Sequence, residues 1–255
     1  MVALEDKCRS PSGDGVLGAG DEMGREFSIF PKQFSSEMVI VEKLKTIFLV
    51  TRKTGCSTMI NALHEAYGTD MHAWPASFGE LPKTKDGASR MRTQELTDQA
   101  KDYYVFAISR DPLTRFYSSV HQAARIEQRN PNPVDYTKTQ VEDMLNRMES
   151  GACHVDEHLE TQAVVLSSPM NDGHRIPVDF IIRMEHMLDD FMVMLDDVEE
   201  KTGIRPEPET EAALHSELSK HKNVGAHDME VKTEAMDTRV REVYHQDFAC
   251  FGGTQ

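Results

Sequence analysis

A short polar loop near residue 55 combines the residue types that bind anions in proteins. It consists of Arg52, Lys53, Thr54, Gly55, Cys56, Ser57 and Thr58. The glycine permits a tight main chain, amides at a helix start attract an anion, and the hydroxyl groups add hydrogen-bond donors. The loop therefore predicts a cradle for a phosphate or a similar group. The alternative is a capped turn whose lysine extends into solvent. The P-loop pattern GxxxxGK[ST] is not matched because the lysine precedes the glycine, and this weakens an ATPase or GTPase interpretation.

A second candidate anion site follows another apolar run further along the chain. Arg110 ends that run, and Ser118 lies two helical turns beyond it, with Arg115 between them. A guanidinium and a hydroxyl group could together hold a second anion. The alternatives are a surface pair of Arg110 with Asp111 and a serine that faces neighbouring helices. Two anion loops on adjacent strands would suit a nucleotide that carries phosphates at both ends.

The two loops must be positioned by the elements that precede and follow them. Short apolar runs predict buried strands over Lys45–Thr51 and Tyr103–Ser109, and Val178–Arg183 is a third candidate. Residues 70–93 are rich in Pro, Gly and Lys and are expected to form a long loop. Helices are expected over 59–68, 113–128, 134–149, 157–166, 186–201, 209–220 and 232–247. This alternation predicts an α/β fold with a parallel sheet flanked by helices and with ligand sites at the carboxyl ends of the strands.

Composition narrows the class of protein and of partner. The chain has 255 residues, 39% of them hydrophobic, and a formal net charge of −15, which suits a soluble globular protein. The charge disfavours a nucleic-acid partner. No run approaches the roughly 18–20 apolar residues that a membrane span needs. Residues 1–35 predict a flexible N-terminal arm and residues 36–255 a single domain.

The four cysteines, Cys8, Cys56, Cys153 and Cys250, lie far apart and have no metal-ligand spacing. The sequence therefore predicts neither a metal site nor a disulfide framework. Cys56 allows two interpretations. Its thiol is either reactive, with a low pKa beside Lys53 and a helix start, or buried and inert.

Five segments, in order, carry a resemblance to a known family. KTGCST and RDPLTRFYSS resemble the 5′-phosphosulfate and 3′-phosphate motifs of sulfotransferases that use 3′-phosphoadenosine 5′-phosphosulfate (PAPS). CHVDEHLETQAVVL, VDFIIRMEHMLDDF and VREVYHQDFACFG resemble three later segments of the Golgi-type carbohydrate sulfotransferases, sulfotransferase family 2. The resemblance covers roughly residues 40–252. It implies a P-loop nucleotide-kinase-like sulfotransferase fold that transfers a sulfuryl group from PAPS to a hydroxyl of a carbohydrate or small-molecule acceptor by in-line displacement, without a metal.

The resemblance also implies roles for particular residues. Arg52, Lys53, Thr54, Gly55, Cys56, Ser57 and Thr58 would surround the 5′-phosphosulfate, and Arg110 and Ser118 would hold the 3′-phosphate. Lys53 would also be catalytic, because its ammonium would stabilise charge on the departing bridging oxygen. The candidates for the general base are His158, the neighbouring Glu157, and His72. For each of them the alternative is a packed or surface residue.

Departures from the family pattern bear on the compartment. Leu159 and Ser167-Ser168 stand where the family commonly has a tryptophan and a cysteine, so Cys153 lacks the partner that the resemblance implies. The membrane anchor and stem of Golgi members are also missing from the sequence given. These departures predict reduced thiols and a cytoplasmic protein, or a Golgi lumenal one if the sequence is part of a longer chain.

Two further interpretations compete with sulfuryl transfer. The sheet and anion loop could serve ATP in a small-molecule kinase, or the chain could be a catalytically degenerate nucleotide-binding interaction protein.

The residues His221, Lys222 and Asn223 resemble a late family loop near the nucleotide, with an exposed polar turn as the alternative. The acidic body disfavours a heavily sulfated polyanionic acceptor. A smaller or less charged hydroxyl compound is the expected acceptor.

Overall fold

The computed structural model describes residues 37–68, 88–92, 102–127, 138–150, 157–167, 178–220 and 232–252. The predicted N-terminal arm, His72 and residues 221–223 lie outside these ranges. The chain divides into two compact units. Among the described residues, the sheet unit contains 37–110 and 165–220, and the helical unit contains 111–164 and 232–252.

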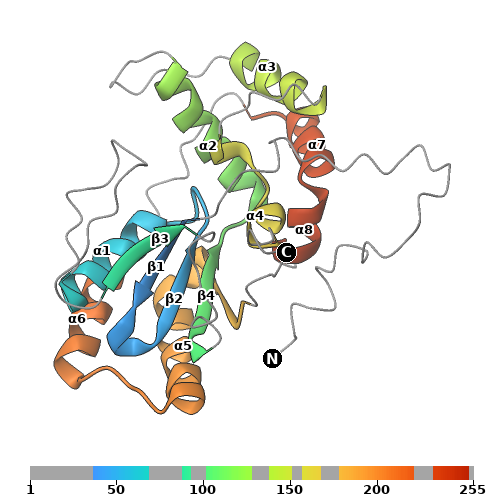
Figure 1. Ribbon diagram of the computed structural model, residues 1–255. Coiled ribbons are helices and arrows are strands. Elements are labelled where there is room, and N and C mark those ends of the chain that lie inside the picture. Colours follow the sequence, from blue (N-terminus) through green and yellow to red (C-terminus); the bar gives the residue numbers. More distant parts are fainter. Residues whose placement is uncertain are drawn as a thin grey trace, which may run out of the picture. The chain divides into compact units, whose positions relative to one another are not determined.

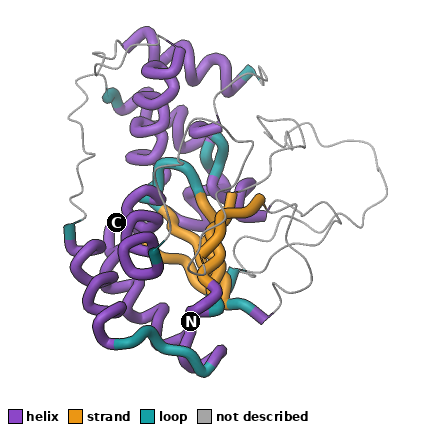
Figure 2. The backbone as a smooth tube through the Cα atoms, turned by 60° about the vertical axis from the view of Figure 1, so that its left-hand side comes forward, coloured by secondary structure: helices purple, strands orange, loops and turns teal. Residues whose placement is uncertain are grey.

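A five-stranded mixed sheet forms the centre of the sheet unit, with the strand order β3-β1-β2-β4-β5 (Figures 1 and 2). The strands β2, β4 and β5 are parallel, as predicted, but β1 runs antiparallel to β2 and to β3. The expectation of a parallel sheet is therefore wrong for one edge. The strands are β1 (Glu37–Val41), β2 (Thr46–Val50), β3 (Ala88–Arg92), β4 (Tyr104–Ser109) and β5 (Phe180–Arg183).

Of the two strands that were not predicted from the sequence, β1 (EMVIV) contains an apolar run, whereas β3 has a weak sequence signal. The sequence of β3 is ASRMR, and it lies at the sheet edge inside the segment predicted as a long loop. Arginines on an edge strand are a common device against unwanted strand pairing, but they dilute the apolar pattern. Strand β1 pairs with β2 through a tight turn in which Lys45 adopts a left-handed conformation, with φ 51°.

The helices agree with the predicted ranges, with two exceptions. The expected helix 157–166 is a 3-10 turn at Glu157–Leu159 followed by a short α-helix, and the expected helix 232–247 is divided at Tyr244. The α-helices are α1 (Cys56–Tyr67), α2 (Pro112–Glu127), α3 (Lys138–Glu149), α4 (Gln162–Ser167), α5 (Met187–Thr202), α6 (Pro208–Ser219), α7 (Glu234–Val243) and α8 (His245–Phe251).

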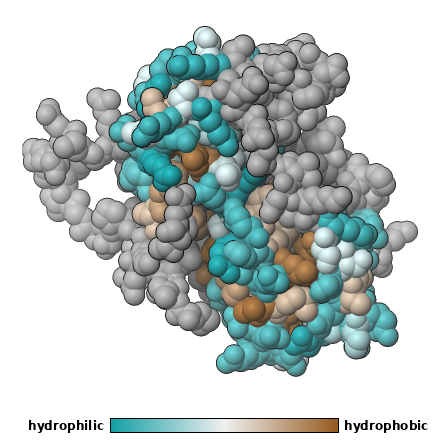
Figure 3. All heavy atoms as spheres, turned by 180° about the vertical axis from the view of Figure 1, so that it is seen from behind, coloured by the Kyte–Doolittle hydropathy of each residue, from teal (hydrophilic) through white to brown (hydrophobic). Residues whose placement is uncertain are grey.

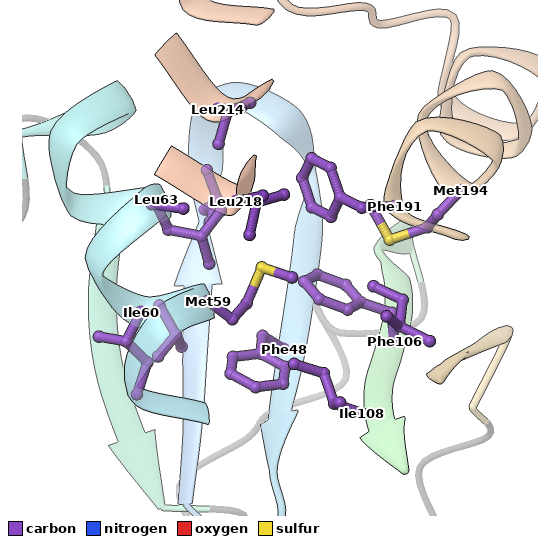
Figure 4. Close-up of a cluster of buried hydrophobic side chains, with 14 of the residues drawn as sticks. Phe48, Met59, Ile60, Leu63, Phe106, Ile108, Phe191, Met194, Leu214 and Leu218 are labelled. Carbon is purple, nitrogen blue, oxygen red and sulfur yellow. The ribbon is translucent and has the colours of Figure 1, made fainter. Parts of the chain in front are cut away.

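The main core of the sheet unit lies between the sheet and helices α1, α5 and α6 (Figure 4). Phe48 of β2 stacks on Phe106 of β4 with ring centroids 5.1 Å apart, and Phe191 of α5 meets Phe106 edge-on. Met59 of α1 and Leu214 of α6 are fully buried in the same cluster. Every residue of β2 and β4 is buried, so both faces of these strands are covered, as expected for central parallel strands.

The helical unit has its own core between α2, α3, α7 and α8. Phe116 and Tyr244 are fully buried there, with ring centroids 5.9 Å apart. At the surface, the Arg239 guanidinium donates two hydrogen bonds of 2.7 Å to the carboxylate of Glu149 and so connects α7 to α3. Each unit therefore has an apolar core of its own.

Hydrophilic side chains cover much of the described surface in the rear view, with smaller apolar areas between them (Figure 3). Within the described ranges, no helix is both long and apolar enough to cross a membrane. The same residues include no group of three or more His, Cys, Asp and Glu side chains that could hold a metal ion.

Candidate functional site

The loop between β2 and α1 has the tight main chain that the sequence predicted. Gly55 is the N-cap of α1 and has φ 86°, a left-handed conformation that glycine adopts without steric cost. Its carbonyl accepts hydrogen bonds from the amides of Thr58 (3.0 Å) and Met59 (3.3 Å), which begin the helix. The first amides of α1 therefore face the start of the loop, where an anion is favoured.

Lys53 also has a left-handed main chain, with φ 64°. For a residue with a Cβ atom this conformation costs about 1–2 kcal/mol. Among the described non-glycine residues, Lys45 is the other one with positive φ. Strained main chain of this kind persists where surrounding contacts enforce it, and it is common at functional sites.

Two buried threonines hold the loop together from inside. The Thr54 hydroxyl donates to the Thr51 carbonyl at 2.9 Å, and the two hydroxyl oxygens are also 2.9 Å apart. The Thr51 hydroxyl reaches across to β4 and donates to the carbonyl of Ile108 at 2.5 Å. Thr54 was predicted to contact a ligand, but its side chain is fully buried, so its possible contribution to an anion is its main-chain amide.

A hydrogen bond from Arg110 connects the second predicted loop to the first. The Arg110 side chain is buried, and Nη1 donates a hydrogen bond of 3.2 Å to the main-chain carbonyl of Lys53. Because β2 and β4 are parallel neighbours, their carboxyl ends lie at the same edge of the sheet. The structure thus places a guanidinium beside the candidate anion loop, in which Arg52, Lys53 and Thr58 are half-buried and Ser57 is exposed.

The Cys56 thiol is buried at the start of α1. Burial raises the pKa of this thiol, and the nearby positive charges of Arg52 and Lys53 only partly oppose the effect. The structure therefore favours the inert interpretation of Cys56 over the reactive one.

Native protein treated with iodoacetamide at pH 7.5 is expected to keep Cys56 unmodified, with alkylation at least about tenfold slower than after denaturation, because the thiol is both inaccessible and protonated. Peptide mapping by mass spectrometry measures the modified fraction. The denatured protein is the control. Rapid alkylation of Cys56 in the native protein would contradict the prediction and restore the reactive interpretation.

The remaining described candidates belong to the helical unit. Ser118 and His158 are half-buried, in α2 and in the 3-10 turn. Arg115, which lies between Arg110 and Ser118 in sequence, is fully buried; Nη1 lies 4.0 Å from a carboxylate oxygen of Asp247, and Nη2 donates to the carbonyl of His158 at 3.4 Å. The side chain of Glu157 lies outside the described residues, as does His72.

A buried polar cluster was not predicted from the sequence. It consists of Arg115, Glu160, Gln162, Tyr244 and Asp247. The Asp247 carboxylate accepts the amides of Gln162 (2.9 Å) and Ala163 (2.8 Å) and thereby caps α4. The Tyr244 hydroxyl donates to the carbonyl of Leu159. These bonds fix the main chain next to His158. The available signal was the pair of a tyrosine and an aspartate in VREVYHQDF, two residues that the family pattern shares.

Cys250 corrects the expectation of reduced thiols. Cys250 is disulfide-bonded, and Cys56 is free. The cysteine that pairs with Cys250 lies outside the described residues, which include neither Cys8 nor Cys153. A chain with widely spaced cysteines gives no indication of pairing, because pairing depends on the fold and not on spacing. The expectation of reduced thiols is therefore wrong for Cys250.

Taken together, the sheet unit has the arrangement of α/β proteins that bind anionic groups at the carboxyl ends of parallel strands. Comparison with known families places the chain within this class. The sulfotransferase family matches residues 36–252, so the chain belongs to that family, of the family 2 type. Membership supports sulfotransfer activity in general and makes the protein a transferase. No curated protein and no solved structure matches the chain significantly.

Proposed function

We propose that the protein transfers the sulfuryl group of PAPS to a hydroxyl of a carbohydrate or small-molecule acceptor. The observation that carries the proposal is the contact between Arg110 and the Lys53 carbonyl, because it gathers the two predicted anion loops at one edge of the sheet. The family segment spans residues of both compact units, which supports one sulfotransferase domain over 36–255.

Residues of the two predicted anion loops are assigned to the two ends of PAPS. The main chain of Lys53–Gly55, the first amides of α1 and the hydroxyls of Ser57 and Thr58 would receive the 5′-phosphosulfate. The guanidinium of Arg110 would bind the 3′-phosphate, and Ser118 of the helical unit stays a predicted ligand of the same group. The left-handed residues Lys53 and Gly55 support this assignment, because such main chain forms concave sites for anions.

In the proposed reaction the acceptor oxygen attacks the sulfur in line with the bridging oxygen, and 3′-phosphoadenosine 5′-phosphate (PAP) leaves. By analogy with phosphoryl transfer, the migrating group is loosely bonded at the transition state, so positioning and neutralisation of charge supply most of the acceleration. Lys53 would neutralise the charge that develops on the bridging oxygen. His158, Glu157 and His72 remain the candidates for the base that takes the acceptor's proton.

The Cys250 disulfide supports an oxidising compartment, such as the Golgi lumen, over the cytoplasm. Disulfides persist in oxidising compartments and are rare in the cytosol. The disulfide therefore favours the second of the two predicted locations.

Nucleotide binding tests the proposal without knowledge of the acceptor. Calorimetry on the full chain is expected to show that PAP binds about 10- to 100-fold more tightly than AMP, because only PAP offers the 3′-phosphate to Arg110. ATP with Mg²⁺ serves as the comparison for a kinase. Equal binding of PAP and AMP, or a clear preference for ATP with Mg²⁺, would contradict the proposal.

Turnover provides the second half of the test. Formation of PAP from PAPS is followed by chromatography in the presence of a mixture of glycans and small hydroxyl compounds, and sulfated products are identified by mass spectrometry. Product formation supports the enzyme and identifies its acceptor class. Tight PAP binding without product across a broad acceptor panel would instead indicate a catalytically degenerate nucleotide-binding protein.

A further inference from the structure

We propose that Arg110 is also a positioning residue for Lys53. Its guanidinium holds the left-handed main chain of Lys53 through the Lys53 carbonyl, so that the 3′-phosphate site and the catalytic lysine share one side chain. This inference rests on the proposed function and adds to it. It assigns Arg110 an effect at the 5′ end of the nucleotide, which a ligand of the 3′-phosphate alone would not have.

The conformation of Lys53 needs a partner that enforces it. The left-handed region is unfavourable for lysine by about 1–2 kcal/mol. At Lys45, with φ 51°, the local turn supplies contacts of its own: the Lys45 amide donates to the Glu42 carbonyl at 3.3 Å, and its ammonium contacts Glu42 and Tyr103. At Lys53 the main-chain carbonyl instead accepts the 3.2 Å hydrogen bond from Arg110, which directly follows the neighbouring strand β4.

Arg110 is suited to this task because its side chain is buried, with 8% of its surface exposed. A buried guanidinium is planar and rigid, and it presents five N–H groups along different edges. One edge can hold the Lys53 carbonyl while another edge donates to a phosphate. A lysine at this position would keep the positive charge but would lack the planar fork that serves both groups at once.

A second hydrogen bond connects the residues next to the two loops. The Thr51 hydroxyl donates to the carbonyl of Ile108 at 2.5 Å, two residues before Arg110. The Thr51 oxygen also contacts Thr54 on the other side of Lys53. The residues on both sides of Lys53 are therefore anchored, and the Arg110 contact fixes the carbonyl of the strained residue between them.

The decisive variant is Arg110→Lys in the full chain, tested with adenosine 5′-phosphosulfate, which lacks a 3′-phosphate. If Arg110 served the 3′-phosphate alone, its substitution would leave the dissociation constant of this probe unchanged. We expect the dissociation constant to rise about three- to tenfold, which is the loss of one hydrogen bond that positions the loop. Ligand-observed NMR measures binding in the millimolar range.

Arg183→Lys is the matched control. Arg183 ends β5 and is the ladder partner of Ser109, but its guanidinium binds Asp190 with bonds of 2.8 and 2.6 Å. This substitution is expected to leave the affinity for adenosine 5′-phosphosulfate unchanged, within about twofold. An equal loss in both variants would assign the effect to general damage at the sheet edge and would overturn the inference.

A second measurement needs no ligand. Amide hydrogen exchange over residues 53–57 is expected to be about three- to tenfold faster in Arg110→Lys than in the wild type, with no change in the turn around Lys45. Unchanged exchange in this loop overturns the inference, even if PAP affinity falls. The proposed function fails separately, if the wild type binds PAP no more tightly than AMP.

Discussion

Lys53→Met is expected to slow sulfuryl transfer from PAPS about 10²- to 10³-fold, the cost of removing one group that stabilises charge at the transition state. Methionine keeps most of the side-chain length and removes the ammonium. The half-buried side chain of Lys53 lies in a loop held by Thr51, Thr54 and Arg110, and those contacts involve other side chains and the Lys53 main chain. The fold is therefore expected to survive the substitution.

The measurement is the rate of PAP formation from PAPS with an acceptor from the glycan and small-molecule panel, together with the dissociation constant of PAP. We expect the rate to fall far more than the affinity, because the lysine acts on charge that develops during the reaction. A change of less than tenfold in rate, in a correctly folded variant, would remove Lys53 from the catalytic assignment.

Lys45→Met is the matched control for this substitution. Lys45 is also a lysine with a left-handed main chain next to β2, but it precedes the strand, whereas Lys53 follows it. Its ammonium contacts Glu42 and lies 4.8 Å from the centre of the Tyr103 ring. Losing these solvent-exposed contacts should change stability little and leave the rate of transfer unchanged.

The parts of the fold that the sequence predicted are those with strong local patterns. Strands β2 and β4 are apolar at nearly every position because both faces are buried, and a continuous apolar run is visible without any knowledge of the fold. Strand β3 has the sequence ASRMR, and only its pairing with β1 identifies it as a strand. An edge strand obtains its stability from its neighbour, which lies far away in the sequence.

The candidate site also combines features that the sequence predicted with features that it could not predict. The residue types of the loop around Lys53 predicted its anion chemistry, and Gly55 predicted its tight turn. The left-handed conformation of Lys53 and its contact with Arg110 could not be predicted, because they depend on the packing of β2 beside β4. Arg115 illustrates the limit most clearly. It lies between the predicted ligands Arg110 and Ser118 in sequence, but it is fully buried beside Asp247, a residue 132 positions later.

Asp247→Ala is the second substitution with a large expected effect, a loss of about 3–5 kcal/mol in the free energy of unfolding. The carboxylate is fully buried and accepts the amides of Gln162 and Ala163 at the start of α4. Its removal leaves these amides without their acceptor and takes a negative charge away from buried Arg115. Each of these consequences is destabilising because the groups left without a partner are buried.

Denaturant unfolding followed by circular dichroism measures the loss, with Asp237→Ala as the control. Asp237 is also an aspartate of the helical unit that accepts a hydrogen bond, from the Tyr117 hydroxyl at 2.6 Å, but it is only half-buried. Its substitution is expected to cost about 1 kcal/mol. Equal costs for the two variants would show that burial of Asp247 adds nothing. If Asp247→Ala does not fold, Asp247→Asn keeps the shape and is expected to lose about 2–3 kcal/mol.

Glu160 is the second carboxylate of the buried cluster. Its substitution is expected to raise stability at high pH, whereas substitution of Asp247 lowers it. Burial raises the pKa of Glu160 from 4.5 to about 7, with Asp247 adding to the effect and Arg115 and the Thr161 amide opposing it. The folded protein then binds this proton more tightly than the unfolded chain. The associated stability is fully present below pH 4.5 and is lost as pH rises to about 7.

Glu160→Gln imitates the protonated side chain at every pH. It should therefore match the wild type near pH 4.5 and be more stable by about 2–3 kcal/mol at pH 8. The groups around Glu160 in the cluster, Arg115, Tyr244 and Asp247, are unchanged in this variant, so the comparison isolates one proton. Unfolding curves at the two pH values measure the difference. A variant that is less stable than the wild type at pH 8 would mean that the ionised Glu160 side chain stabilises the folded protein, and it would contradict the raised pKa.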